Sequence, residues 1–179
     1  MIIKKIEIEN FLCYYWNSST NDKNIFELAD GLNIILGENG EGKTKFFEAV
    51  DWLFNGENRE LDKLVSAKKL NETEIGDSFR VRVSMTVEQY GEKSIISKSF
   101  LAKKENANEC STSSFMIEGI CENSSGERTQ VDGQVLLDRI FPFQIRKYSM
   151  FKGEAELNIF ENESALVNLI NLFSEAKHY

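Results

Sequence analysis

Alternating apolar and polar residues predict β-strands in several parts of the chain. The clearest run covers residues 79–88, where Phe79 and every second residue after it are apolar and the residues between are polar or charged. A turn at residues 89–92 leads into a partner strand at 94–101, so this region is expected to form a hairpin. Further strands are expected at residues 1–10, 25–28 and 115–121.

A second pattern surrounds a glycine-rich stretch in the first third of the chain. Residues 32–36 (LNIIL) are β-branched and nearly continuous in apolar character, which predicts a short strand buried on both faces. After Thr44, apolar residues recur at helical spacing as far as Phe54, and Gly56 is placed to end that helix. A short helix is expected at residues 135–140, and loops are expected at 17–24, 103–114 and 122–133.

Residues 37–44 (GENGEGKT) match the phosphate-binding pattern GxxxxGK[ST] in full. The glycines permit a backbone that turns successive N–H groups inward as an anion nest, and the helix N-terminus adds partial positive charge. Lys43 would reach the β- and γ-phosphate oxygens, and the Thr44 hydroxyl would complete part of a Mg²⁺ shell. The sequence therefore predicts a site for ATP and Mg²⁺ that is formed by Asn39, Gly40, Glu41, Gly42, Lys43 and Thr44.

Composition narrows the class of protein further. The chain is 41% hydrophobic and 28% charged, as in globular proteins, and no stretch approaches the about 18 apolar residues of a membrane span. Three scattered cysteines without CxxC spacing are typical of reduced thiols in a cytosolic protein, and with one histidine they form no zinc site. The net charge of −8 excludes capture of nucleic acid by the whole surface, so DNA contact requires a local basic patch.

Hydrolysis requires more than a phosphate-binding loop. An acidic residue at the end of a second core strand has to organise Mg²⁺, and another group has to position water. The nearest candidate for the acid is Asp138 after Leu136 and Leu137, but two leucines do not make a strand. We therefore expect this sequence to hold part of an active site, without catalytic residues of its own.

Residues 1–11 (MIIKKIEIENF) and 30–44 (DGLNIILGENGEGKT) together resemble the N-terminal half of SMC-like ABC ATPase heads. That group includes double-strand-break repair ATPases and RecF-type proteins. Within this group, the sequence most resembles bacterial defence members, such as the ATPases of phosphorothioation-linked and Lamassu-type antiphage systems. Residues 46–54 (FFEAVDWLF) and 140–154 are similar to that subgroup as well, so the resemblance spans nearly the whole chain.

The resemblance implies an α/β fold, a P-loop NTPase half-head with a strand-rich ABC-type lobe and the root of a coiled-coil helix. The half-head would be residues 1–154, with its P-loop core at about 1–60 and its strand-rich portion at about 79–121, and the coiled-coil arm would begin at 155–179. The same longer chain would supply the C-terminal half-head with the signature motif, the Walker B acid and the water-positioning glutamate. A second copy of the head would sandwich ATP. Other expected partners are DNA and further subunits of a repair or defence complex, in the bacterial cytosol or nucleoid.

Two positions depart from the family pattern. Leu12 stands where relatives commonly carry Arg or Lys. The Q-loop glutamine, which in relatives reaches Mg²⁺ and the γ-phosphate, aligns most naturally with Lys152, and Glu154 or Gln144 are the alternatives. A lysine there would repel Mg²⁺ unless it swings toward phosphate, so the resemblance implies an ATPase that is slow or needs a partner to complete it.

The strand-rich portion carries the basic patch. Residues 79–104 hold six basic and two acidic side chains, a net charge of +4, so the remaining residues carry −12. On one face of a hairpin, Arg80, Arg82 and Lys98 would contact DNA phosphates. A solvated strand face explains the same charges equally well.

The leading hypothesis is an ATP-driven SMC-like clamp or motor that senses or processes DNA in repair or antiphage defence. One alternative is a stand-alone P-loop enzyme such as a small nucleotide kinase, although the arginines after the P-loop are scattered and do not suggest a lid. Another alternative is a head that binds ATP in order to dimerise and does not hydrolyse it. The sequence does not separate this last possibility from the leading hypothesis.

Overall fold

The computed structural model describes residues 1–17, 24–38, 40–55, 60–143 and 146. It divides the chain into two compact units, Met1–Leu137 and Asp138–Tyr179. The strands are β1 (Ile2–Glu9), β2 (Asn24–Glu27), β3 (Ser78–Gln89), β4 (Glu92–Lys104), β5 (Cys110–Thr112), β6 (Met116–Glu122) and β7 (Arg128–Asp132). The helices are α1 (Lys43–Asn55), the 3-10 helix η1 (Leu61–Leu64), α2 (Ala67–Glu72) and α3 (Gly133–Ile140).

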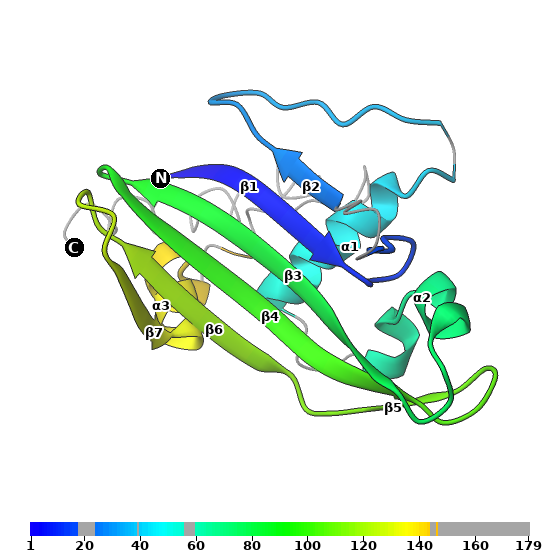
Figure 1. Ribbon diagram of the computed structural model, residues 1–179. Helices are drawn as coiled ribbons and strands as arrows, with labels where there is room; N and C mark the ends of the chain where they lie inside the picture. The colour runs from blue at the N-terminus through cyan, green and yellow to red at the C-terminus, as the bar shows by residue number, and fades with distance from the viewer. Residues whose placement is uncertain (18–23, 39, 56–59, 144–145, 147–179) are drawn as a thin grey trace, which may run out of the picture. The chain divides into compact units, whose positions relative to one another are not determined.

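The strands form one seven-stranded antiparallel sheet in the order β2-β1-β3-β4-β6-β7, with β5 paired to β4 (Figure 1). Its centre is the β3–β4 hairpin, in which Gln89 pairs with Glu92 and Tyr90 and Gly91 make the turn. Both turn residues have positive φ, 54° and 80°. Such a pair is what a type I′ turn requires, and the twist of that turn matches the twist of the strands.

One face of the sheet, called here the inner face, is largely apolar and packs on α1. Val81, Val83 and Met85 of β3 are buried there because side chains alternate along a strand. Trp52 of α1 is buried with them, its ring centroid 5.8 Å from that of Phe100 on β4. This packing holds α1 against the sheet near the helix C-terminus.

The N-terminal half of α1 is fixed by a separate aromatic cluster. The ring centroids of Phe46 and Phe26 are 4.7 Å apart, and Phe26 belongs to β2. Tyr14, from the segment after β1, completes the cluster at 5.8 Å from Phe26. The start of the helix is therefore attached to the β1–β2 edge of the sheet.

The structure confirms the hairpin, the strands expected at residues 1–10, 25–28 and 115–121, and the helices expected after Thr44 and at 135–140. It also confirms a mixed α/β fold with an antiparallel, strand-rich part. The start of a coiled-coil arm at residues 155–179 lies outside the described residues.

The prediction that residues 32–36 form a buried strand is wrong. They belong to no strand, and the side chains of Leu32 and Leu36 are 88% and 86% exposed. In Figure 1 they lie within the long open loop between β2 and α1. A strand needs a neighbour to bond its backbone and cover its side chains, and none of the described residues supplies one.

Two loop predictions are wrong, because here neighbouring strands are present and pair with segments that were expected to be loops. Residues 103–114 contain the end of β4 and all of β5, and residues 122–133 contain β7. β7 is polar, yet it pairs with β6 from Glu118↔Asp132 to Glu122↔Arg128. Backbone hydrogen bonds made this edge strand, and they leave no apolar pattern in the sequence.

Candidate nucleotide-binding site

The glycine-rich loop ends where α1 begins, at Lys43. Gly40 and Gly42 have φ of +94° and +93°, a conformation that side chains with a Cβ rarely adopt. At Gly42 there is also no room, because an added Cβ would lie 2.7 Å from Sγ of Cys13. The sequence thus places glycine where the backbone must both reverse and approach its neighbour closely.

Lys43 is turned back over the loop that precedes it. Its Nζ donates hydrogen bonds to the carbonyl oxygens of Gly37, at 2.5 Å, and Glu38, at 2.6 Å. The side chain is exposed, so the ammonium group can exchange these carbonyls for other oxygens without leaving the loop. Phosphate oxygens are suitable replacements, because their charge strengthens each hydrogen bond.

Glu41 closes the same loop from the other side. Its Oε2 accepts a hydrogen bond from the backbone N–H of Glu38 at 2.7 Å, and its own N–H donates to the carbonyl of Glu38 at 3.3 Å. Glu41 therefore acts on the shape of the loop. Asn39, which the sequence also placed in the site, lies outside the described residues.

The segment after β1 contacts the loop at Gly42 through Cys13 and Tyr14. The sequence pattern did not reveal this contact. The Tyr14 hydroxyl donates a hydrogen bond to the carbonyl of Gly42 at 3.0 Å. Burial raises the pKa of Tyr14 to about 12, so the hydroxyl remains a donor throughout the physiological range. Burial also raises the pKa of the neighbouring Cys13 thiol, which keeps it neutral beside Gly42.

The arrangement fits a nucleotide triphosphate. Two glycines with positive φ lie next to a helix N-terminus, and Lys43 and Thr44 are exposed in its first turn. No group of three or more His, Cys, Asp or Glu side chains suited to a metal ion occurs among the described residues. The expected role of the Thr44 hydroxyl in binding Mg²⁺ stays a prediction.

Comparison with known proteins decides the family. Residues 5–178 match the family described as AAA domain, which is nearly the whole chain. The chain belongs to this family. AAA domains are P-loop ATPase domains, so membership implies that the nucleotide is ATP.

A relative of this AAA domain is the DNA double-strand break repair Rad50 ATPase of Sulfurisphaera tokodaii, which is 30% identical over 99 residues. The match covers 55% of this chain and 10% of the relative, so the chain spans a small part of the relative's length. Among the described residues, no helix is both long and apolar enough to cross a membrane.

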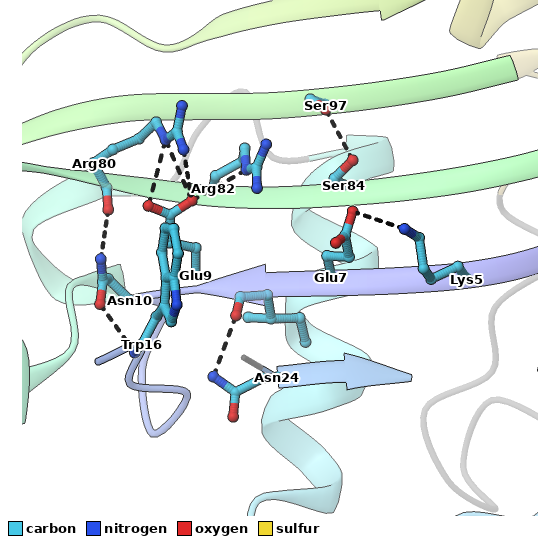
Figure 2. A network of polar contacts seen from close by, with 11 residues as sticks. Lys5, Glu7, Glu9, Asn10, Trp16, Asn24, Arg80, Arg82, Ser84 and Ser97 are labelled. Atoms are coloured by element: carbon cyan, nitrogen blue, oxygen red, sulfur yellow. Dashed lines mark hydrogen bonds and ion pairs between the residues drawn. The ribbon is translucent and has the colours of Figure 1, made fainter. Parts of the chain in front are cut away.

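The face of the sheet opposite α1, called here the outer face, carries two of the three residues expected to contact DNA. Arg80 and Arg82 lie on β3 between the buried positions, and their side chains are 46% and 29% exposed. Both form ion pairs with Glu9 of β1, at 3.1 Å and 3.2 Å (Figure 2).

The prediction that Lys98 shares this face is wrong. Lys98 pairs with Val83 in the register of β3 and β4, which turns its side chain to the inner face, where it is 2% exposed. Its Nζ donates a hydrogen bond to the carbonyl of Trp52 at 3.1 Å and lies 4.3 Å from the Phe115 ring centroid. A buried ammonium group in these contacts cannot reach a DNA phosphate.

The remaining expected site residues, Lys152, Glu154 and Gln144, lie outside the described residues. Leu12, which stands where relatives commonly carry a basic residue, has a positive φ of 51° and follows the buried Phe11. Its backbone N–H donates to the carbonyl of Leu64.

Proposed function

We propose that this AAA domain is the ATP-binding N-terminal half-head of an SMC-like, Rad50-like ATPase that couples ATP binding and hydrolysis to DNA sensing or processing, in repair or antiphage defence. The observation that carries the proposal is the loop at the start of α1. The backbone has positive φ at Gly40 and Gly42, and the Lys43 ammonium group donates to carbonyls of the same loop. The family of this chain is a P-loop ATPase family.

Each side chain of the loop has a separate role in this proposal. Lys43 would leave the carbonyls of Gly37 and Glu38 and bind the β- and γ-phosphate oxygens. Thr44 would bind the Mg²⁺ that accompanies the nucleotide, and the N–H groups at the start of α1 would bind phosphate oxygens. Glu41 and the Tyr14 hydroxyl would hold the loop in shape while Lys43 exchanges partners.

A second half-head is needed in this proposal, and the exposed segment before the loop supports it. Leu32, Ile34, Ile35 and Leu36 expose much of their apolar surface, and the described residues leave their backbone without a strand partner. A contiguous apolar stretch of this kind marks an interaction surface. We propose that a strand of the C-terminal half-head covers it and brings the acid and the water-positioning glutamate.

The test is ATP binding by the full-length protein, measured by calorimetry with Mg²⁺. Lys43→Ala should weaken binding at least about tenfold, because a hydrogen bond to a charged group contributes about 1.5–3 kcal/mol. Lys45→Ala is the matched control, since Lys45 lies on the same helix and its Nζ pairs with Glu48 at 3.1 Å instead of with the carbonyls of Gly37 and Glu38. Equal ATP affinity in wild-type protein and the Lys43 variant would contradict the proposal.

A further inference from the structure

Two arginines on the outer face share a single carboxylate. Nε and Nη2 of Arg80 donate hydrogen bonds to Oε2 of Glu9 at 3.3 Å and 3.1 Å. Nε of Arg82 lies 3.2 Å from the same oxygen as an ion pair, without the alignment of a hydrogen bond. Figure 2 shows the carboxylate facing both guanidinium groups. One negative charge is thus shared by two positive charges.

The arginines keep donors that Glu9 does not use. A guanidinium group has five N–H donors. Within the described part of the chain, Glu9 is the partner of the Arg80 and Arg82 side chains, and the terminal nitrogens of Arg82 have none. Because both side chains are partly exposed, these groups face solvent and can donate hydrogen bonds to an oxyanion.

The carboxylate is more deeply buried than the arginines. Glu9 is 7% exposed and stands opposite Arg82 in the pairing of β1 with β3. The next residue, Asn10, donates its side-chain amide to the carbonyl of Arg80 at 2.8 Å and accepts the backbone N–H of Trp16 at 3.2 Å. The strand end is therefore fixed, and the carboxylate stays near the arginines unless they turn away from it.

The charge of this cluster suits one phosphodiester. Arg80, Arg82 and Glu9 together carry +1, and a backbone phosphate carries a single negative charge. The adjacent acid on the same face, Glu7, pairs with Lys5 at 3.4 Å and leaves this balance unchanged. A phosphate binds arginine in the same forked geometry as a carboxylate, so the two anions compete for the same donors.

We propose that Glu9 is an intramolecular competitor of a DNA phosphate for Arg80 and Arg82, and that a phosphodiester binds the outer face by taking over donors that Glu9 now shares. This inference rests on the proposed DNA-binding function. The carboxylate lowers the affinity of the face for DNA and keeps two closely spaced positive charges from repelling each other while DNA is absent. The rival explanation is that the cluster only joins β1 to β3, as partly exposed ion pairs do.

The test measures duplex DNA binding by the full-length protein over a range of salt concentrations. Glu9→Gln keeps the size of the side chain and removes its charge, so the net charge of the cluster rises to +2. We expect tighter binding and a slope of log K against log salt that is steeper by about 0.9, the value for one more neutralised phosphate. Between 50 and 200 mM salt the gain over wild-type protein should then shrink by about 3.5-fold.

The matched control is Glu7→Gln, which removes the same charge from the same face two residues away. Any general effect of net charge appears in both variants. The proposal requires a larger gain for Glu9→Gln and requires that this gain disappear when Arg80 and Arg82 are also changed to Gln, because contacting residues are not additive. A Glu9 gain equal to the Glu7 gain, or one that survives without the arginines, would overturn it.

Two further measurements keep the outcomes distinct. If Glu9→Gln fails to fold, by thermal unfolding, the arginines are tested alone. Changing Arg82 to Gln should then flatten the salt slope by about 0.9, and an unchanged slope would overturn the inference. If wild-type protein binds no duplex DNA, the DNA-binding part of the proposed function fails. Pyrophosphate also suits the loop at residues 37–44, so the comparison is between wild-type protein and Glu9→Gln, which share that loop. A Glu9→Gln gain for pyrophosphate without one for DNA would indicate a small-anion site on the outer face and would also overturn the inference.

Discussion

Reversing the charge of Lys98 tests the register that places this side chain in the core. Lys98 is 2% exposed, and its ammonium group donates to the carbonyl of Trp52 and lies over the rings of Trp52 and Phe115. In Lys98→Glu a carboxylate would replace this donor beside a carbonyl oxygen, an arrangement without hydrogen bonds. Leaving a buried charge uncompensated costs about 3–5 kcal/mol. This is a large part of the about 5–15 kcal/mol that stabilises a domain.

Two other variants, each expected to lose less stability, serve as comparisons for Lys98→Glu. Lys98→Met keeps the apolar stem and buries no charge, so the loss should be about 1–3 kcal/mol, from the donor removed from Trp52. Lys103→Glu makes the same charge reversal on the same strand, but its side chain is 52% exposed, with Glu105 at 3.9 Å. At such a surface position we expect a change of about 0.5 kcal/mol or less.

The assay is hydrogen exchange of the α1 amides in the full-length protein, because exchange reports the local stability of the helix that Lys98 contacts. Protection of α1 should fall most in Lys98→Glu, less in Lys98→Met and least in Lys103→Glu. If Lys98→Glu kept wild-type protection and weakened DNA binding, Lys98 would lie on the outer face and the β3–β4 register would be wrong.

Three further predictions concern the nucleotide-binding loop. Gly42→Ala should weaken ATP binding, measured by calorimetry, through a clash with Sγ of Cys13 and through the positive φ, which costs about 1–2 kcal/mol. Adding Cys13→Ala should restore only the part of the affinity that the clash removes. Equal affinity in all variants would show that the loop is not constrained. Residues 1–179 alone should show no ATP turnover in a phosphate-release assay, whereas turnover that Lys43→Ala abolishes would reveal a complete active site. Burial raises the pKa of Tyr14 to about 12, so its contribution to stability should be intact below the unfolded pKa of about 10 and should fall as pH rises from about 10 toward 12. Unfolding curves at each pH measure this loss, which should be absent in Tyr14→Phe.

The sequence could predict the parts of the fold that local interactions decide. The phosphate-binding loop requires glycine at fixed positions and a lysine at the start of a helix, and those demands are met within residues 37–44. The alternation in residues 79–88 was equally informative, because a strand buried on one face needs an apolar side chain at every second position. The resemblance to SMC-like heads rested on the same kind of local pattern.

In strand β4, the local sequence pattern does not predict which face of the sheet each side chain occupies. Residues 92–104 do not alternate, so the sequence could not assign a face to Lys98, and a shift of one residue would have placed it on the outer face. The pairing with β3 made that choice. Similarly, residues 32–36 have the composition of a buried strand, but a strand forms only beside another one.

The sequence by itself determined a loop for phosphate, the helix that follows it and the alternating strand β3. Only the tertiary structure decided that Glu9 lies between Arg80 and Arg82, more than 70 positions away in the chain for both, and that Tyr14 donates to Gly42. The physical reason is the range of the interactions. Backbone conformation and side-chain periodicity are set by neighbours in sequence, whereas charge pairing and close packing depend on strand register, which the whole sheet fixes at once.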